Sequence, residues 1–167
     1  MAHSLILGVT ESGKTTLAKK LAKKYRDKKI PVLVLDPFKG SSWPSSYITD
    51  DPEKFLAIVK KSRSCAIFID ECGAWMKKFS HVLTELATTG RHYGHNCHFI
   101  SQRGIQLSPT IRTQCPNIFL FKQSLQDTKD LSAEFVADEL MNAHTLKKGE
   151  YLGKIGVDGK VFKTRAF

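Results

Sequence analysis

Short apolar runs alternate with longer amphipathic stretches along the chain. The runs lie at residues 4–7, 32–35, 65–69, 98–101 and 117–121. An apolar run without polar alternation is typical of a strand that is covered on both faces, as in a parallel sheet. The pattern therefore predicts five buried strands.

The stretches between these runs carry signals for helices. Leu17, Leu21 and Tyr25 recur one helical turn apart in residues 15–26, opposite a lysine-rich face. Asp51 followed by Pro52 is typical of a helix start, and this helix should run to about residue 61. Further helices are predicted at about 77–89, after Ser108-Pro109, and at 127–143, whereas residues 38–51 read as a loop.

The end of the chain predicts a β-hairpin, in which residues 151–155 pair with 161–164 across an Asp158-Gly159 turn. Strands that alternate with helices predict an α/β fold with a mostly parallel central sheet flanked by helices. A length of 167 residues suits one domain with a substantial core. We expect a single P-loop ATPase domain over residues 1–167, with its core at about 1–145 and the hairpin at about 149–165.

The first strand leads directly into a phosphate-binding pattern, Gly8-Val9-Thr10-Glu11-Ser12-Gly13-Lys14-Thr15. Its glycines let backbone N–H groups point at phosphate oxygens, and Lys14 places a positive charge on the terminal phosphates. The preceding strand and the following helix provide the context that this motif requires. The residues expected at ATP are Gly8, Thr10, Glu11, Ser12, Gly13, Lys14, Thr15 and Thr16.

The third apolar run ends in Asp70 and Glu71. An aspartate at this place typically holds Mg²⁺, together with the hydroxyl of the phosphate-loop residue Thr15. Glu71 is suited to polarise the water that attacks the terminal phosphoryl group. The alternative is an acidic pair that only caps the next turn. A water-activating glutamate predicts hydrolysis and disfavours a small-molecule kinase, which must exclude that water.

The fourth run ends in Ser101 and Gln102. In P-loop enzymes of the additional-strand (RecA-like) type this strand would lie between the two motif strands. An amide there could hydrogen-bond both the terminal phosphate and the attacking water, so Gln102 is a candidate catalytic residue beside Lys14 and Glu71. The alternative is a surface glutamine that closes a strand.

Charge, cysteine content and hydrophobicity indicate the kind of partner, the state of the thiols and the absence of a membrane span. A balance of 26 basic and 16 acidic residues gives a formal charge of +10, which favours a polyanionic partner but also serves solubility. The four cysteines contain no Cys-x-x-Cys pair, so we expect buried thiols. No apolar run is long enough to span a membrane, and the first strand leaves no place for a signal peptide, so secretion is not expected.

Four segments together resemble FtsK/HerA-type DNA translocases: the phosphate loop and residues 35–40, 68–71 and 100–103. The compact length is similar to that of genome-packaging ATPases of icosahedral viruses with an internal membrane. The resemblance covers about residues 5–121. One departure is Glu11, because the family loop commonly has glycine at this position.

The resemblance implies an ATP-hydrolysing motor that translocates double-stranded DNA without sequence preference. It also implies a ring, usually a hexamer, with ATP between subunits and an arginine that reaches across. The candidates are Arg91, Arg103 and Arg112, of which Arg91 fits best because residues 90–94 resemble the segment before the sensor strand. The alternative for Arg91 is a cation that interacts with the last carbonyls of a helix.

DNA contacts are expected from the loop 38–47 with Lys39 or from residues 75–78, and both segments could equally be subunit contacts. The hairpin has a positive edge that could bind DNA or only protect its strands from pairing, formed by Lys147, Lys148, Lys154, Lys160, Lys163 and Arg165. The lysine cluster at 19–29 reads better as a solvated helix face. The expected setting is the host cytoplasm or a viral packaging vertex, where a vertex or membrane protein would be a further partner. The alternatives are an assembly or export ATPase for single-stranded DNA or protein, a nucleotide or small-molecule kinase, and a slowly hydrolysing switch module.

Overall fold

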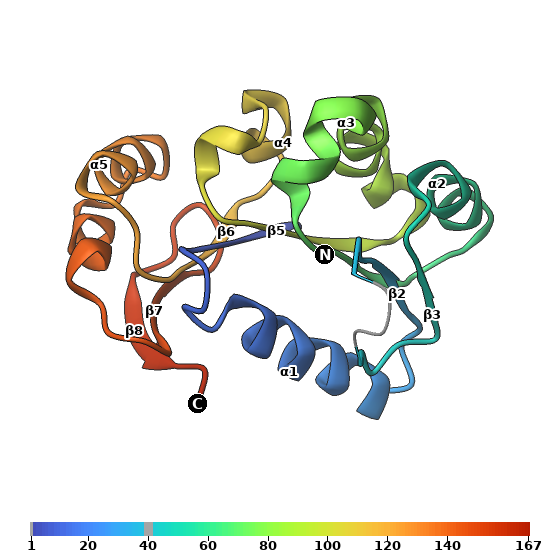
Figure 1. The fold of residues 1–167 in the computed structure, drawn as a ribbon, viewed down its shortest axis with the longest axis horizontal. Coiled ribbons are helices and arrows are strands. Elements are labelled where there is room, and N and C mark those ends of the chain that lie inside the picture. The colour runs from blue at the N-terminus through green and yellow to red at the C-terminus, as the bar shows by residue number, and fades with distance from the viewer. Residues whose placement is uncertain (1, 39–41) are drawn as a thin grey trace.

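The computed structural model describes residues 2–38 and 42–167, and its strands form one twisted sheet (Figure 1). In the described residues the strand order is β3-β2-β4-β5-β1-β6-β7-β8. The strands are β1 (Ser4–Leu7), β2 (Val32–Leu35), β3 (Tyr47–Thr49), β4 (Ala66–Ile69), β5 (Asn96–Ser101), β6 (Asn117–Leu120), β7 (Glu150–Lys154) and β8 (Phe162–Arg165). The first six pair in parallel, whereas β7 and β8 are antiparallel. This confirms the mostly parallel sheet and the terminal hairpin.

Strand β5 lies between β1 and β4, which is the additional-strand arrangement expected from the sequence. Leu7 at the end of β1 is in register with Ser101 at the end of β5, and Ile69 at the end of β4 is in register with Phe99. The carboxyl ends of these three strands therefore share one edge of the sheet. The residues that follow them meet at this edge.

Helices cover both faces of the sheet (Figure 1). Of the described helices, α1 (Lys14–Asp27) covers one face, and the other face carries α2 (Pro52–Lys61), α3 (Cys72–Thr89), α4 (Pro109–Thr113) and α5 (Leu125–Glu134). Short 3₁₀ segments add η1 (Gly90–Tyr93), η2 (Gly104–Gln106) and η3 (Asp138–Thr145). Within the described part of the chain, no helix combines the length and the apolar character needed to cross a bilayer.

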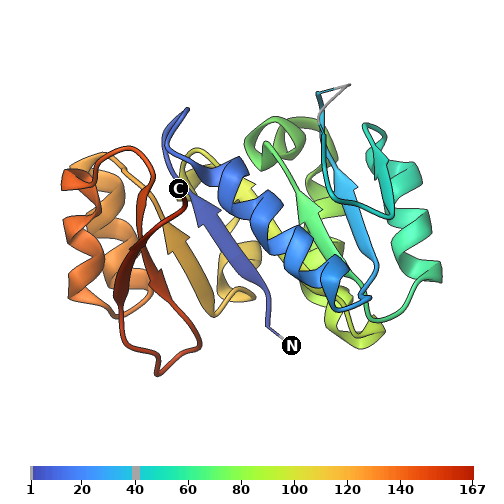
Figure 2. The same ribbon diagram turned by 90° about the horizontal axis from the view of Figure 1, so that it is seen from below.

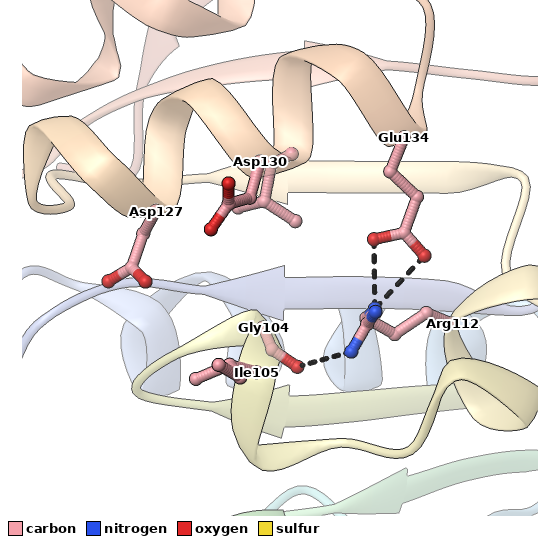
Figure 3. Close-up of a pocket in the computed structure, with 7 residues that line it drawn as sticks. Gly104, Ile105, Arg112, Asp127, Asp130 and Glu134 are labelled. Atoms are coloured by element: carbon pink, nitrogen blue, oxygen red, sulfur yellow. Dashed lines mark hydrogen bonds and ion pairs between the residues drawn. The ribbon is translucent and has the colours of Figure 1, made fainter.

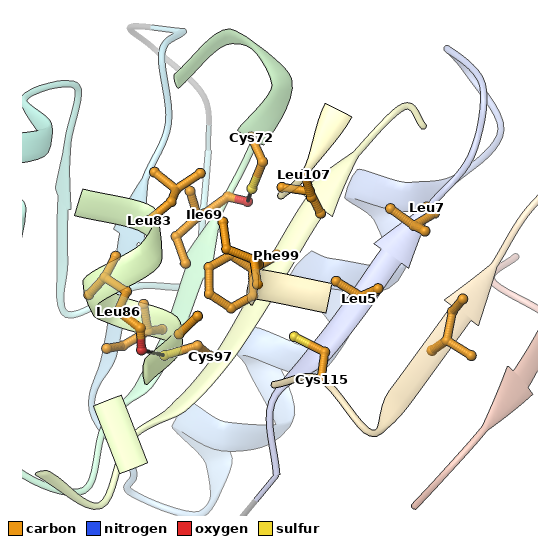
Figure 4. Close-up of a cluster of buried hydrophobic side chains, with 14 of the residues drawn as sticks. Leu5, Leu7, Ile69, Cys72, Leu83, Leu86, Cys97, Phe99, Leu107 and Cys115 are labelled. Carbon is orange, nitrogen blue, oxygen red and sulfur yellow. Dashed lines mark hydrogen bonds between the residues drawn. The ribbon is translucent and has the colours of Figure 1, made fainter. Parts of the chain in front are cut away.

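The sheet separates two apolar clusters, because successive side chains of a strand point to opposite faces. Leu5 and Leu7 pack in the cluster beneath α2, α3 and α4, which Figure 4 shows, while Ile6 packs against α1. All four cysteines are buried free thiols, as expected. Three of them donate hydrogen bonds to main-chain carbonyls: Cys65 to Arg63, and, as Figure 4 shows, Cys72 to Ile69 and Cys97 to Leu86.

Two predictions in the first half of the chain need correction. The stretch 38–51, expected to be a loop, contains β3, a short and half-buried strand that extends the sheet beyond β2. Helix α3 begins at Cys72 rather than near Lys77. Its backbone leaves helical geometry at Phe79 (φ −125°, ψ 33°), so the prediction located only the second of two helical segments that meet there.

Two more corrections concern the second half. The helix expected at 127–143 is split, because Val136 adopts φ 49° and separates α5 from η3. A β-branched residue in the left-handed region cannot continue a helix. The hairpin strands end at Lys154 and resume at Phe162, so the connection spans 155–161 rather than the expected 156–160, and it turns where the Gly159 N–H donates to the Gly156 carbonyl. The loop is anchored by Asn117, whose side-chain oxygen accepts a hydrogen bond from the Gly156 N–H (2.8 Å).

Candidate active site

The phosphate loop joins β1 to α1 and depends on its two glycines. A Cβ atom at Gly8 would lie 2.5 Å from Phe121 Cβ, and Gly13 adopts φ 114°, which side-chain-bearing residues rarely do. Lys14 opens α1 with a buried side chain whose ammonium donates to the Val9 carbonyl (2.9 Å). Burial lowers the pKa of Lys14, and the nearby Glu71 and Asp70 counteract this effect. The loop thus holds a desolvated cation that an incoming phosphate can attract away from Val9.

Glu11 adopts the left-handed conformation, with φ 60°. This backbone geometry costs a residue with a Cβ roughly 1–2 kcal/mol. It explains physically why glycine is common at this position of the family loop. The exposed carboxylate also places negative charge at the rim of the phosphate site.

Thr15 and Asp70 come together at the shared edge of the sheet. The Thr15 hydroxyl lies 3.5 Å from Asp70 Oδ2 and donates to it. Asp70 is buried, and burial raises the pKa of its carboxyl to about 6. A hydroxyl and a carboxylate fit Mg²⁺, which takes few protein oxygens and completes its shell with water and phosphate. No group of three or more His, Cys, Asp or Glu side chains in the described residues forms an alternative metal site.

Glu71 stands at the N-cap of α3 in the left-handed conformation (φ 50°, ψ 47°). Its N–H donates to Asp70 Oδ1 (2.9 Å), and Trp75 Nε1 donates to the Asp70 carbonyl (2.9 Å). The first turn of α3 therefore fixes the backbone of both acids. Strained backbone of this kind persists only where the surrounding structure enforces it, and it is concentrated at functional sites.

Gln102 follows β5 directly, so the strand order places it between the phosphate loop and the acidic pair. Its carbonyl accepts a hydrogen bond from Gln123 Nε2 (2.8 Å). The next residue, Arg103, makes a two-pronged ion pair with Asp127 of α5 (2.9 and 2.8 Å). These contacts fix the backbone immediately after the Gln102 side chain.

The three candidate arginines differ in their partners. Arg103 is held by Asp127, and Arg112 donates to both carboxylate oxygens of Glu134 (2.9 and 2.8 Å) and to the Leu107 carbonyl (2.8 Å). Figure 3 shows Arg112 in a cavity of about 160 Å³ between η2 and α5. Arg91 is exposed on η1, where it donates to the Gln114 carbonyl. Because η1 precedes the amino end of β5, Arg91 lies at the sheet edge opposite its own phosphate loop.

Two residues beside the phosphate loop, Lys148 and Phe167, were not among those expected at ATP. A cavity of about 360 Å³ is lined by Glu11, Gly13, Lys14, Thr15, Thr16, Lys148 and Phe167. A neighbouring cavity of about 370 Å³ contacts the other side of the loop and shares Lys148. The sequence predicts the hairpin but not its place in the sheet, so it gave no signal that Lys148 and Phe167 would reach the phosphate loop.

The expected DNA-contacting segments have different surroundings. Lys39 and Gly40 lie outside the described residues, and residues 75–78 belong to α3. Lys154 does not contribute to a positive hairpin edge, because it is buried and its ammonium donates to the carbonyls of Gly156 and Val157. Lys163 pairs with Glu150 (3.3 Å).

Comparison with solved structures identifies proteins of the same fold. The genome-packaging NTPase B204 of Sulfolobus turreted icosahedral virus 2 matches in its sulfate complex with a TM-score of 0.81 and 20% identity, over 98% of this chain and 96% of that one. Its AMPPCP complex gives 0.79 and 18%, over 98% and 97%. The conjugation coupling protein TcpA of pCW3 gives 0.74 and 19%, over 96% of this chain but 59% of that one. The resemblance to packaging ATPases and related translocases is thus confirmed at the level of the fold.

Sequence comparison supplies the family. No curated protein sequence matches the chain. The model of the ATPase family associated with various cellular activities (AAA) matches residues 4–100, which contain the phosphate loop, the acidic pair and most of β5. This match spans more than half of the sequence, and the chain belongs to the AAA ATPase family.

Proposed function

We propose that this protein is an ATP-hydrolysing motor that translocates double-stranded DNA, as a viral genome-packaging ATPase. The observation that carries the proposal is the contact of Thr15 with Asp70. It lies at the edge of the sheet where the strand order also places Glu71 and the Gln102 end of β5. The full-length fold likeness to a viral packaging NTPase supports this choice among ATPase functions.

In the proposed reaction Lys14 exchanges the Val9 carbonyl for the terminal phosphates of ATP. Mg²⁺ would be held by Thr15 and Asp70, and when bound it would neutralise phosphate charge. Glu71 polarises the attacking water, and the Gln102 amide orients that water against the terminal phosphate. The remaining phosphate-loop residues, Gly8, Thr10, Glu11, Ser12, Gly13 and Thr16, surround the phosphate chain.

We further propose that the subunits form a ring, most simply a hexamer, with ATP at each interface. Arg103 and Arg112 are each held by a carboxylate of the same chain. Arg91 is exposed and donates to the main-chain carbonyl of Gln114, so it can be released to a neighbouring subunit at low cost. There it would stabilise charge on the transferred phosphoryl group, as arginine fingers do.

The proposed DNA contacts are made to phosphates and are therefore independent of sequence. A formal charge of +10 supports binding to a polyanion, and such binding should weaken steeply with salt. In this role the protein would act in the host cytoplasm or at the packaging vertex of a virion.

An export motor for single-stranded DNA or protein is the nearest alternative. Its fold counterparts are the conjugation coupling protein TcpA and the Type VII secretion ATPase EccC of Thermomonospora curvata, which matches at 17% identity with a TM-score of 0.70. This chain covers 59% and 25% of those proteins, but 97% of the packaging NTPase in its AMPPCP complex. The packaging motor is favoured because its counterpart matches this fold with the higher TM-score, 0.79 against 0.74 and 0.70.

Steady-state ATP hydrolysis in the presence of duplex DNA, single-stranded DNA or no DNA tests the proposal. We expect duplex DNA to stimulate turnover more than single-stranded DNA does, and added salt to abolish the stimulation. If the rate of ATP hydrolysis were equal in all three conditions at every protein concentration, the protein would be an ATPase, but the proposal of a packaging motor would be refuted. Stimulation by single-stranded DNA alone would favour the export alternative.

A further inference from the structure

We propose that Phe167 and Lys148 complete the ATP site from the terminal hairpin, with the adenine base stacked on the Phe167 ring and the Lys148 ammonium paired with the phosphate chain. This inference rests on the proposed function, because it takes ATP as the ligand of the phosphate loop. It adds a recognition element from the terminal hairpin, a part of the chain outside the phosphate-loop and acidic motifs.

Main-chain hydrogen bonds fix the hairpin against the phosphate loop. The Gly149 N–H donates to the Ser12 carbonyl (2.9 Å), and the Ala166 N–H donates to the Gly149 carbonyl (2.8 Å). The start of β7 and the end of β8 are thereby held beside the loop. Figure 2 shows the last residues of the chain next to the start of α1.

The Phe167 ring lies close to two glycines. A Cβ at Gly13 would be 3.0 Å from one ring carbon, and a Cβ at Gly149 would be 2.9 Å from another. Phe167 nevertheless remains 55% exposed, although it is a large apolar side chain. Its ring lines the same cavity of about 360 Å³ as Lys14, Thr15 and Thr16. The ring is therefore supported by the loop and offers free surface to a ligand of that loop.

The strand order gives the bound nucleotide a direction. On one side of β1 lie β5 and β4, and β4 is followed by Asp70, which with Thr15 would hold the metal of the terminal phosphates. On the other side lie β6, β7 and β8, and Lys148 lies just before β7 while Phe167 lies just after β8. A triphosphate that reaches Asp70 with its terminal end must leave the loop toward the hairpin with its nucleoside end. Lys148 lines both cavities that flank the loop, so its ammonium can pair with the phosphate chain.

Stacking is the chemistry that this arrangement offers to a base. Every nucleobase has a π face, and stacking on an aromatic side chain contributes substantially to affinity without reading the base edge. A supported and exposed ring in the lining of the cavity meets this requirement. A bare phosphate chain would gain nothing from it.

The test compares two ligands, Mg-ATP and Mg-tripolyphosphate, which shares the phosphates but has no base. Dissociation constants are measured by calorimetry for wild type, Phe167→Ala, Phe167→Tyr, Lys148→Ala and the control Phe162→Ala, a ring on β8 outside the cavity lining. We expect Phe167→Ala to weaken ATP binding at least about fivefold and to leave tripolyphosphate binding unchanged. Phe167→Tyr and the control should keep wild-type affinities, and Lys148→Ala should weaken both ligands.

Unchanged ATP affinity in Phe167→Ala would overturn the stacking. Equal losses for both ligands would also overturn it, because the ring would then only support the loop. The proposed function fails differently: wild type would bind neither ligand, or would bind and hydrolyse ATP without any response to DNA.

Discussion

Thr15 and Asp70 are 55 positions apart in the sequence, yet the Thr15 hydroxyl lies 3.5 Å from Asp70 Oδ2. The contact exists because β1 and β4 are parallel and only β5 separates them. Any residue that follows one of these strands shares an edge with those that follow the others. The proposed catalytic roles of Lys14, Glu71 and Gln102 depend on this one feature of the topology.

Glu71→Gln should separate binding from hydrolysis. The amide keeps the size of the side chain but cannot accept the proton of the attacking water, so turnover should fall on the order of 100- to 10,000-fold. The affinity for ATP should stay within about twofold of wild type, because Glu71 is not expected to contact the phosphates. Single-turnover hydrolysis and equilibrium ATP binding measure the two effects. Asp70→Asn is the contrasting variant, and it should weaken the Mg²⁺-dependent part of ATP binding. If Glu71→Gln turned over ATP at the wild-type rate, the acidic pair would have only a capping role.

Glu11→Gly should relieve backbone strain in the phosphate loop. Glycine accepts φ 60° freely, so the free energy of unfolding should rise by up to about 1 kcal/mol. ATP affinity should also increase, since a carboxylate leaves the rim of the phosphate site. Glu11→Gln is the matched control, because it removes the charge and keeps the Cβ. Chemical denaturation and ATP titration of both variants distinguish strain from charge, and a loss of stability in Glu11→Gly would refute the strain.

Arg91→Ala and Arg112→Ala should fail in different ways. Arg91 has an exposed side chain at the sheet edge remote from its own phosphate loop, so its removal should leave the melting temperature nearly unchanged. In the assembled protein, turnover should fall about 1,000-fold or more if Arg91 acts across the interface. Arg112→Ala leaves Glu134 and the Leu107 carbonyl without their partner and should instead cost about 1–3 kcal/mol of stability. If the assembled Arg91→Ala protein hydrolysed ATP at the wild-type rate, Arg91 would only be a cation that interacts with the last carbonyls of its helix.

His98 should make the protein sensitive to mild acid. The ring stacks on Phe68 (centroids 4.5 Å apart), and its Nε2 lies 3.2 Å from the Tyr25 hydroxyl. Burial lowers the pKa of His98 to about 3. The folded protein keeps this ring neutral, whereas the unfolded chain takes up a proton below pH 6.5, so stability falls as the pH drops. At pH 5 the loss from His98 is roughly 2 kcal/mol relative to neutral pH.

Denaturation of wild type and His98→Phe between pH 7 and pH 4 measures this effect. The variant should lose stability less steeply with falling pH. Burial also lowers the pKa of His3, to about 4, so part of the slope should remain. The carboxyl of Asp70 acts in the opposite direction, because its pKa is raised to about 6 in the folded protein. Identical slopes for the two proteins would show that His98 is not held neutral.

The sequence predicts the active-site edge well because each motif follows an apolar strand directly. Gly8, Asp70 and Gln102 come immediately after their strands, so a strand assignment also fixes their place in an α/β sheet. The strand order itself was expected through the family resemblance and not through the pattern.

The elements that were missed depend on tertiary contacts or on local strain. Strand β3 is short and half-buried, and pairing with β2 forms it where the sequence alone shows a polar stretch. The break at Val136 requires a positive φ, which a β-branched residue rarely adopts, so the residue type does not predict it. Phe167 reaches the phosphate loop only because β7 pairs with β6 and returns through β8. Such long-range pairing leaves no mark on the local sequence.

Displacement of a third DNA strand from a duplex tests the central claim most directly, because a motor that travels along duplex DNA must remove a triplex-forming oligonucleotide from its path. We predict ATP-dependent displacement by wild type, none by Glu71→Gln, and loss of the activity at salt concentrations that abolish DNA binding. Steady ATP hydrolysis on duplex DNA without any displacement of the third strand would contradict the account.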